Sequence, residues 1–359
     1  MDSERFLNGI KGPVKISYEP TIGCNLRCPM CDRTKKAEYI NHRDYELPYE
    51  RKLAFMNEIS RSGVRHFLFI GGGEPMMDPH LTEYMRILKA GGIFVHLWTN
   101  GTLINEANAP ELARLCDMIT VSLDSPRAEV NDLSRGVKGA TQKTIDGIRL
   151  LRKHSGQLYL RIHSVISALN IDHLLAFADF AAENGVNEIA GALMAPFEFV
   201  PEAMRFSDDQ LRSIGVRIEE VCEYAKRKGV ALGCWYENKS AKMIQNLTNL
   251  HNMYPVSSPQ VTSRAITCLG LWGQATVRPN GDVSVCCFSY KPVLGNLHEQ
   301  TFEEIWHSKR AEELRKLVLE GNYIDQPCVG CDMGHPVFTR DLELTGNLDS
   351  FLEMTVNAR

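Results

Sequence analysis

The chain alternates apolar strands with amphipathic helices over most of its first 236 residues. Apolar runs that suit buried strands lie at residues 14–19, 65–70, 94–99, 118–124, 158–165 and 188–194. Amphipathic segments lie between them, near residues 49–61, 80–90, 107–115, 139–154 and 171–184. Because strands that alternate with helices usually pair in parallel, this order predicts a parallel α/β architecture. A doubly wound sheet would show the same alternation.

The alternation ends in a long helix and a polar connector. Ser207 and Gln210 fit a capping box that opens a helix to about residue 228, and Gly229 ends it. A further candidate strand follows at residues 230–236, before a polar stretch rich in Asn and Ser. We therefore expect four regions, at residues 1–236, 237–264, 265–335 and 336–359.

Three cysteines near the start of the chain indicate an iron–sulfur site. Cys24, Cys28 and Cys31 follow the spacing Cys-x3-Cys-x2-Cys. A structural zinc site uses four ligands and closes its coordination shell. A cubane iron–sulfur cluster that is held by three thiolates leaves one iron open to a small molecule. The odd number of thiolates in one tight loop therefore favours an open iron–sulfur cluster.

A glycine-rich segment follows the second candidate strand. The apolar run at residues 66–70 leads directly into the sequence GGGEP at residues 71–75. Together with the cysteine loop, this segment resembles the radical S-adenosylmethionine (radical SAM) enzymes. The resemblance implies that the open iron of a 4Fe–4S cluster chelates the methionine part of SAM. It further implies reductive cleavage to a 5′-deoxyadenosyl radical that abstracts a hydrogen atom, and an open (β/α)6 partial barrel for residues 1–236.

The resemblance also assigns residues that would contact SAM. Met30, directly before the third cysteine, would meet the adenine. The amino group would be held by Gly72, Gly73 and Glu74. Ribose and carboxylate contacts are expected where later strands end, from Thr99, Asn100, Ser122, Asp124, and either Arg135 or Arg161. The alternative for each of these is a turn or surface residue.

A second group of cysteines lies near the C-terminus. Cys268-x12-Gly281-x4-Cys286, followed by Cys328-x2-Cys331, resembles the SPASM extension of many radical SAM enzymes. Because no cysteine follows Cys331, the pattern is similar to the shortened twitch version, as in 2-deoxy-scyllo-inosamine dehydrogenase. The resemblance implies a second 4Fe–4S cluster, held by Cys268, Cys286, Cys328 and Cys331. A structural zinc ribbon is the alternative for this set.

Two features suggest groups that act on the substrate. Polar residues share one face of a strand in three cases, as the pairs Ser17 and Glu19, His96 and Trp98, and Arg161 and His163. Buried parallel strands are usually apolar on both faces, so these residues are candidates for a site inside the barrel. Arg161 or His163 is a candidate base for the proton of a substrate radical, and packing roles are the alternative. Cys287 is open to three roles: inert thiol, hydrogen-atom donor or cluster ligand.

Composition excludes several classes of partner. The formal net charge of −4 gives no basic surface for nucleic acid. No apolar run approaches the roughly 20 residues that span a bilayer, and the N-terminus lacks a secretory signal. We therefore expect a cytoplasmic protein whose cysteines stay reduced.

The resemblance predicts an oxidoreductase that oxidises a hydroxyl-bearing carbon of a sugar or aminocyclitol. The auxiliary cluster would accept the second electron, and flavodoxin or ferredoxin would supply the first. One alternative is a sugar epimerase in which a thiol such as Cys287 returns hydrogen. Another is modification of a ribosomally made peptide, for which the short segment before the first strand leaves no room for a leader-recognition domain. A non-catalytic iron–sulfur sensor or zinc module is the alternative outside enzymes.

Overall fold

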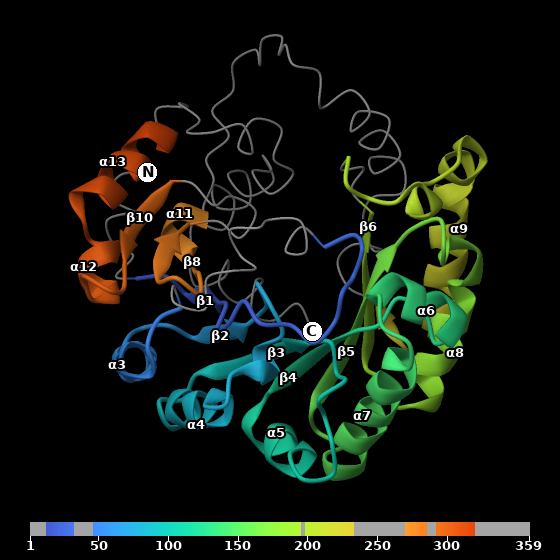
Figure 1. Ribbon diagram of the computed structural model, residues 1–359, viewed down its shortest axis with the longest axis horizontal. Coiled ribbons are helices and arrows are strands. Elements are labelled where there is room, and N and C mark those ends of the chain that lie inside the picture. The colour runs from blue at the N-terminus through green and yellow to red at the C-terminus, as the bar shows by residue number, and fades with distance from the viewer. Residues whose placement is uncertain (1–11, 32–45, 195–197, 233–269, 286–291, 320–359) are drawn as a thin grey trace.

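A single curved sheet with helices on its outer side organises the molecule (Figure 1). The computed structural model describes residues 12–31, 46–194, 198–232, 270–285 and 292–319. Among these residues, ten strands pair in the order β10-β9-β8-β1-β2-β3-β4-β5-β6-β7. The first seven strands are parallel, and they are β1 (Lys15–Tyr18), β2 (His66–Phe69), β3 (Phe94–Thr99), β4 (Met118–Ser122), β5 (Tyr159–Ile166), β6 (Glu188–Leu193) and β7 (Ala231–Leu232).

The strand order decides between the two architectures that the alternation allows. From β1 to β7 each strand pairs with the strand that precedes it in the chain, and the order never reverses. A doubly wound sheet needs such a reversal. Because crossover connections have one hand, unidirectional winding places the helices on one face and leaves the other face as a concave interior. The expected radical SAM type of partial barrel is confirmed.

Helices lie between the strands, at the positions where the hydrophobic periodicity predicts them. They are α3 (Tyr49–Ile59), α4 (Leu81–Ala90), α5 (Ala109–Leu115), α7 (Ala140–His154), α8 (Leu175–Glu183) and α9 (Asp208–Arg227). The capping box at Ser207 and Gln210 is present, and Gly229 has a φ of 73° just after α9. The amphipathic pattern did not predict the short helix α6 (Ala128–Arg135), which contributes to the site.

Alternate residues of each strand face the two sides of the sheet. Ile16, Phe67, Val95 and Ile119 are fully buried in the main hydrophobic cluster, which also contains Phe55 of the outer helix α3. The opposite, concave face carries polar side chains, as the register Thr120↔Arg161↔Glu188 shows. The expectation that polar strand residues line the interior is therefore confirmed for these strands.

The C-terminal extension continues the sheet beyond β1. β8 (Gln274–Val277) pairs in parallel with β1, while β9 (Asp282–Ser284) and β10 (Val293–Asn296) add antiparallel strands. Short helices α11 (Gly270–Gly273), α12 (Phe302–Trp306) and α13 (Lys309–Leu319) accompany them at one end of the sheet (Figure 1). Within the described residues, no helix has the length and apolar character to cross a membrane.

Candidate active site

The three N-terminal cysteines lie in the loop that follows β1. All three side chains are half-buried. The Cys31 backbone N–H donates to the Cys28 carbonyl at 3.1 Å, so the second half of the loop is a tight turn. Three thiols on one short loop at the carboxyl end of a barrel strand are a donor set that fits a cluster with one open iron.

The GGGEP loop after β2 lies directly against the cysteine loop. The Gly73 N–H donates to the Thr21 carbonyl at 3.0 Å, and the Glu74 N–H donates to the Gly23 carbonyl at 2.7 Å. A Cβ atom at Gly73 would lie 2.0 Å from the Gly23 carbonyl oxygen. Only glycine allows this approach, so the two motifs that are 40 residues or more apart in the chain form one structural unit.

The Glu74 carboxylate holds the GGGEP loop onto the end of β3. It accepts hydrogen bonds from Thr99 Oγ1 at 2.6 Å, the Asn100 N–H at 2.7 Å and the Met76 N–H at 3.1 Å. Burial raises the pKa of this carboxyl, and the three hydrogen bonds oppose that shift. Glu74 and Thr99 therefore bind each other, which gives both a clear positioning role.

Helix α6 holds the cysteine loop from the other side. The Arg27 N–H donates to the Arg135 carbonyl at 3.3 Å, where α6 ends. Gly136 follows with a φ of 68°, and a Cβ atom there would lie 2.1 Å from the Arg27 carbonyl oxygen. Burial raises the pKa of the Cys28 thiol to about 11, while the nearby Arg135 guanidinium acts in the opposite direction.

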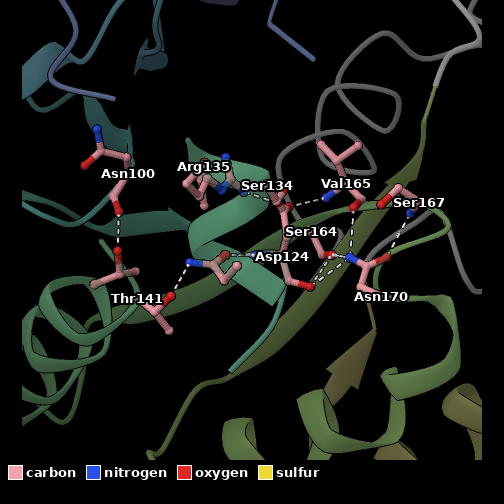
Figure 2. Close-up of polar contacts among 12 residues, drawn as sticks. Asn100, Asp124, Ser134, Arg135, Thr141, Ser164, Val165, Ser167 and Asn170 are labelled. Carbon is pink, nitrogen blue, oxygen red and sulfur yellow. Dashed lines mark hydrogen bonds and ion pairs between the residues drawn. The ribbon is translucent and has the colours of Figure 1, made fainter. Parts of the chain in front are cut away.

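Asp124 connects α6 to β4 and β5 (Figure 2). Its carboxylate accepts hydrogen bonds from Arg135 Nη2 at 2.7 Å, from the Val165 N–H at 2.8 Å and from the Ser134 hydroxyl. Its carbonyl accepts a further bond from Asn170 Nδ2 at 2.8 Å. The Arg135 side chain thus already has a carboxylate partner. The Asp124 carboxylate accepts three hydrogen bonds in the interior.

A cavity of about 180 Å³ lies between these elements. Its lining includes both motif loops and the ends of β3 and β4, among them Cys24, Cys28, Gly73, Thr99, Ser122 and Arg135. The lining also includes Asn100, Glu74 and Trp98. Thiols, glycine backbone and hydroxyl groups around one cavity fit SAM bound at a three-cysteine cluster. This cavity therefore brings together eight of the residues that the sequence proposed for the cluster and SAM.

Other proposed SAM contacts lie near this cavity without lining it. Met30 packs instead in a small apolar cluster with Met194, Val200 and Met204. Gly72 faces away, against the Glu19 carboxylate. The roles of Met30, Gly72 and Asp124 toward SAM stay predictions.

Arg161 and His163 occupy successive layers of the interior face of β5. Arg161 pairs with Glu188 through Nε at 2.7 Å, and the Tyr159 hydroxyl also donates to Glu188. His163 lies beside Ser122 in the register, and its ring meets Trp98 edge to face at 4.8 Å. Burial lowers the pKa of His163 to about 4, so its imidazole is neutral at pH 7.

Some supporting residues were not identified from the sequence. Lys52 reaches inward from α3, and its Nζ donates to the Pro20 carbonyl at 2.6 Å and pairs with Asp78 at 2.7 Å. This buried pair holds the segment before the cysteine loop. A lysine on the inner face of an amphipathic helix is the signal that would have indicated it.

Several predicted features lie outside the described residues. They are the connector, the C-terminal tail at residues 336–359, and the thiols Cys268, Cys286, Cys287, Cys328 and Cys331. Their roles as auxiliary cluster ligands or hydrogen donor stay predictions.

Comparisons with protein families agree with this site. The radical SAM superfamily domain matches residues 18–181, and the SPASM iron–sulfur cluster-binding domain matches residues 268–332. The matched ranges include both groups of cysteines and both motif loops.

Characterised relatives are similar over most of the chain. An AdoMet-dependent heme synthase from Methanosarcina barkeri is 29% identical over 85% of this chain and 84% of its own. Mycofactocin maturase MftC from Mycobacterium ulcerans is 27% identical over 88% and 79% of the two chains. The PqqA peptide cyclase from Gluconobacter oxydans is 24% identical over 89% and 83%.

The fold is also similar to a solved structure. SuiB of Streptococcus suis bound to S-adenosylmethionine superposes with a TM-score of 0.65 and 17% identity, covering 92% of this chain and 73% of that chain. These comparisons do not support oxidation of a sugar or aminocyclitol, which the sequence favoured. They agree better with the peptide alternative, because a PqqA peptide cyclase is among the relatives.

Proposed function

Because the chain belongs to the radical SAM superfamily and carries a SPASM iron–sulfur domain, we propose that it modifies a ribosomally made peptide. The observation that supports SAM chemistry is the cavity between the cysteine loop and the GGGEP loop. The peptide substrate is supported by the peptide-modifying relatives. SAM and a 4Fe–4S cluster are the cofactors of the superfamily, and SPASM domains hold auxiliary iron–sulfur clusters. When bound, SAM and its cluster supply reductive cleavage and abstraction of a hydrogen atom from the substrate.

The residues around the cavity divide into binding and positioning roles. Cys24, Cys28 and Cys31 would hold the cluster, and the backbone of Gly73 would face the amino group of SAM. Glu74 keeps that backbone in place through its hydrogen bonds to the end of β3. Ser122 lines the cavity and accepts a hydrogen bond from the Trp98 indole at 3.1 Å, so both are placed for contacts with SAM or substrate.

His163 is the better candidate for accepting a proton from the substrate. The Arg161 guanidinium is charged and held by Glu188, so it has no free lone pair for a proton. The neutral His163 imidazole has one, and it lies about two residues, or roughly 7 Å, further along β5 toward the cavity. Arg161 and Glu188 would then position the substrate beneath the cavity.

The variants His163→Gln and Arg161→Lys test whether His163 is the base and Arg161 positions the substrate. We expect His163→Gln to lower the rate of product formation by about 100-fold or more, because general base catalysis contributes on that order. Uncoupled formation of 5′-deoxyadenosine should continue, because SAM binding does not need His163. Arg161→Lys keeps the charge and should raise the substrate KM more than it lowers kcat. Unchanged product formation by His163→Gln would reject its role as the base.

The proposed reaction class has a direct test. Protein reconstituted anaerobically with iron and sulfide is incubated with SAM and dithionite, and 5′-deoxyadenosine is measured by chromatography. We expect Cys28→Ala to abolish this product and Cys222→Ala, a half-buried thiol on α9, to preserve it. A wild-type protein that forms no 5′-deoxyadenosine would contradict the radical SAM assignment.

A porphyrin substrate is the second candidate, because the heme synthase has the highest sequence identity of the three relatives described above. The two substrates are distinguished by adding either a peptide encoded beside this gene or a porphyrin precursor of heme. Only the true substrate should increase 5′-deoxyadenosine formation and change mass. A mass change in the porphyrin alone would contradict the peptide proposal.

A further inference from the structure

Glu19 and Arg278 form a buried ion pair between the barrel and the C-terminal extension. Glu19 directly follows β1, and Arg278 directly follows β8. Their side chains are 7% and 8% exposed, and Arg278 Nη1 donates to Glu19 Oε1. The Glu19 N–H also donates to the Val277 carbonyl at 2.9 Å. The pair therefore closes the carboxyl end of the β1–β8 contact, where blue and orange strands lie side by side in Figure 1.

Gly72 of the GGGEP loop lies against Glu19 and against Pro279, the residue that follows Arg278. A Cβ atom at Gly72 would lie 2.6 Å from Glu19 Oε2 and 3.6 Å from Pro279 Cγ, the residue after Arg278. The Leu47 N–H donates to the Pro279 carbonyl at 2.7 Å, which holds this turn of the extension. Because Gly72 has no side chain, any displacement of the Glu19 carboxylate acts directly on the backbone of the loop.

The next two residues of the loop face the cavity side. Gly73 lines the cavity, and the Gly73 and Glu74 N–H groups bind the segment before the cysteines. One short loop is thus fixed on one side by the cysteine loop and on the other by Glu19. Removing one charge from a buried pair takes away the charged group that offsets the desolvation of the other. Loss of Arg278 would therefore drive the Glu19 carboxylate toward water and release Gly72.

We propose that Glu19 and Arg278 are a positioning pair that makes SAM affinity depend on how the C-terminal extension is seated against the barrel. The identity of the ligand rests on the proposed function. Neither residue lines the cavity, so neither is a catalytic residue. The pair gives the extension a structural role at the SAM site that is separate from holding an auxiliary cluster.

Hydrogen exchange of backbone amides tests the positioning without any cofactor. In Arg278→Met we expect the Gly73 and Glu74 amides to exchange about tenfold faster or more, because the loop loses its support from Glu19. The matched control is Arg86→Met, which breaks the exposed ion pair with Glu111 on the outer helices. Its Gly73 and Glu74 amides should exchange as in the wild type.

SAM binding to the reconstituted protein tests the consequence. We expect Arg278→Met and Glu19→Gln each to raise the Kd for SAM about tenfold, which corresponds to about 1.4 kcal/mol. The double variant should bind no more weakly than either single variant, because both changes break one interaction. Arg278→Lys, which keeps the charge, should recover most of the affinity, whereas a purely packing role would not be rescued.

Wild-type exchange and wild-type SAM affinity in a folded Arg278→Met protein would overturn the proposal. If that variant does not fold, Glu19→Gln keeps the side-chain shape and decides the question by the same two measurements. The proposal would also be overturned if the losses of SAM affinity in Arg278→Met and Glu19→Gln simply added in the double variant. Failure of the SAM chemistry in the proposed function looks different, because the wild type itself would then form no 5′-deoxyadenosine while the exchange result stands.

Discussion

At the scale of single residues, Gly136 and Gly139 show what distinguishes a site glycine from a turn glycine. Both have positive φ angles, of 68° and 83°. A Cβ atom at Gly136 would collide with the Arg27 carbonyl oxygen of the cysteine loop, whereas a Cβ atom at Gly139 would meet nothing within 4 Å. A side chain at Gly139 therefore meets only the strain of a left-handed backbone. A side chain at Gly136 meets that strain and also contacts the cysteine loop.

Alanine at each position should reveal this difference. Both substitutions cost roughly 1–2 kcal/mol in stability because of the left-handed backbone, measurable by urea unfolding. Only Gly136→Ala should also lower the amount of iron bound at the cysteine loop, because Arg27 must move. Iron per chain is measured after reconstitution, with Cys24→Ala as the reference for an empty loop. Equal iron in both glycine variants would show that the contact with Arg27 has no influence on the cluster.

At the scale of elements, β2 and β3 place neutral histidines inside the barrel. His66 and His96 stack with ring centroids 5.6 Å apart, and His96 Nε2 bonds Thr120 Oγ1 at 2.8 Å. Burial, together with the charges of Lys15 and Arg161, lowers the pKa of His66 to about 3. Burial likewise lowers the pKa of His96. These elements hold imidazoles where protonation is unfavourable.

Stability should therefore fall as the solution is acidified. The unfolded chain binds protons to histidine below pH 6.5, whereas folded His66 does so only near pH 3, so acid favours unfolding across that window. Each such group contributes at most about 1.4 kcal/mol per pH unit. His66→Gln should make the free energy of unfolding less dependent on pH between 6.5 and 5. The exposed His298→Gln is the control, and identical pH slopes for the two variants would reject this origin.

At the scale of the whole molecule, the extension and the barrel form one sheet. β8 pairs with β1 along its whole length, Lys15 to Tyr18 against Gln274 to Val277. Trp272, Val283 and Phe302 belong to the same hydrophobic cluster as the barrel core. Where the structure describes them, the expected regions at residues 1–236 and 265–335 therefore share one sheet and one hydrophobic cluster.

Removal of residues 265–359 should expose the edge of β1. An unpaired apolar edge strand promotes association, so the shortened chain is expected to aggregate instead of forming a stable monomer. Size-exclusion chromatography with light scattering measures this, and supplying residues 265–359 as a separate chain should reduce the aggregation. A monomeric shortened chain with native helix content would contradict a shared fold.

How far the sequence predicts the structure differs between elements. Most of the long, regular segments were placed within about two residues, because hydrophobic periodicity depends on local pattern; the helix expected at 171–184 begins four residues later, at Leu175. Helix α6 was missed because it is only eight residues long and most of those residues are polar. The cavity residues could be proposed from the resemblance to radical SAM enzymes, whereas the partners of Lys52 and Arg278 could not, because they are distant in the chain.

The sequence alone indicated the cofactors of this protein, because three thiols, a glycine loop and a second cysteine group resemble those of radical SAM enzymes with auxiliary clusters; the sugar substrate that it favoured was not supported. Only the tertiary structure decided how the strands are ordered and which carboxylate each buried arginine meets. The reason is physical. Ligand type and local periodicity depend on neighbouring residues, whereas strand order and buried ion pairs depend on packing between segments up to 259 residues apart, as for Glu19 and Arg278.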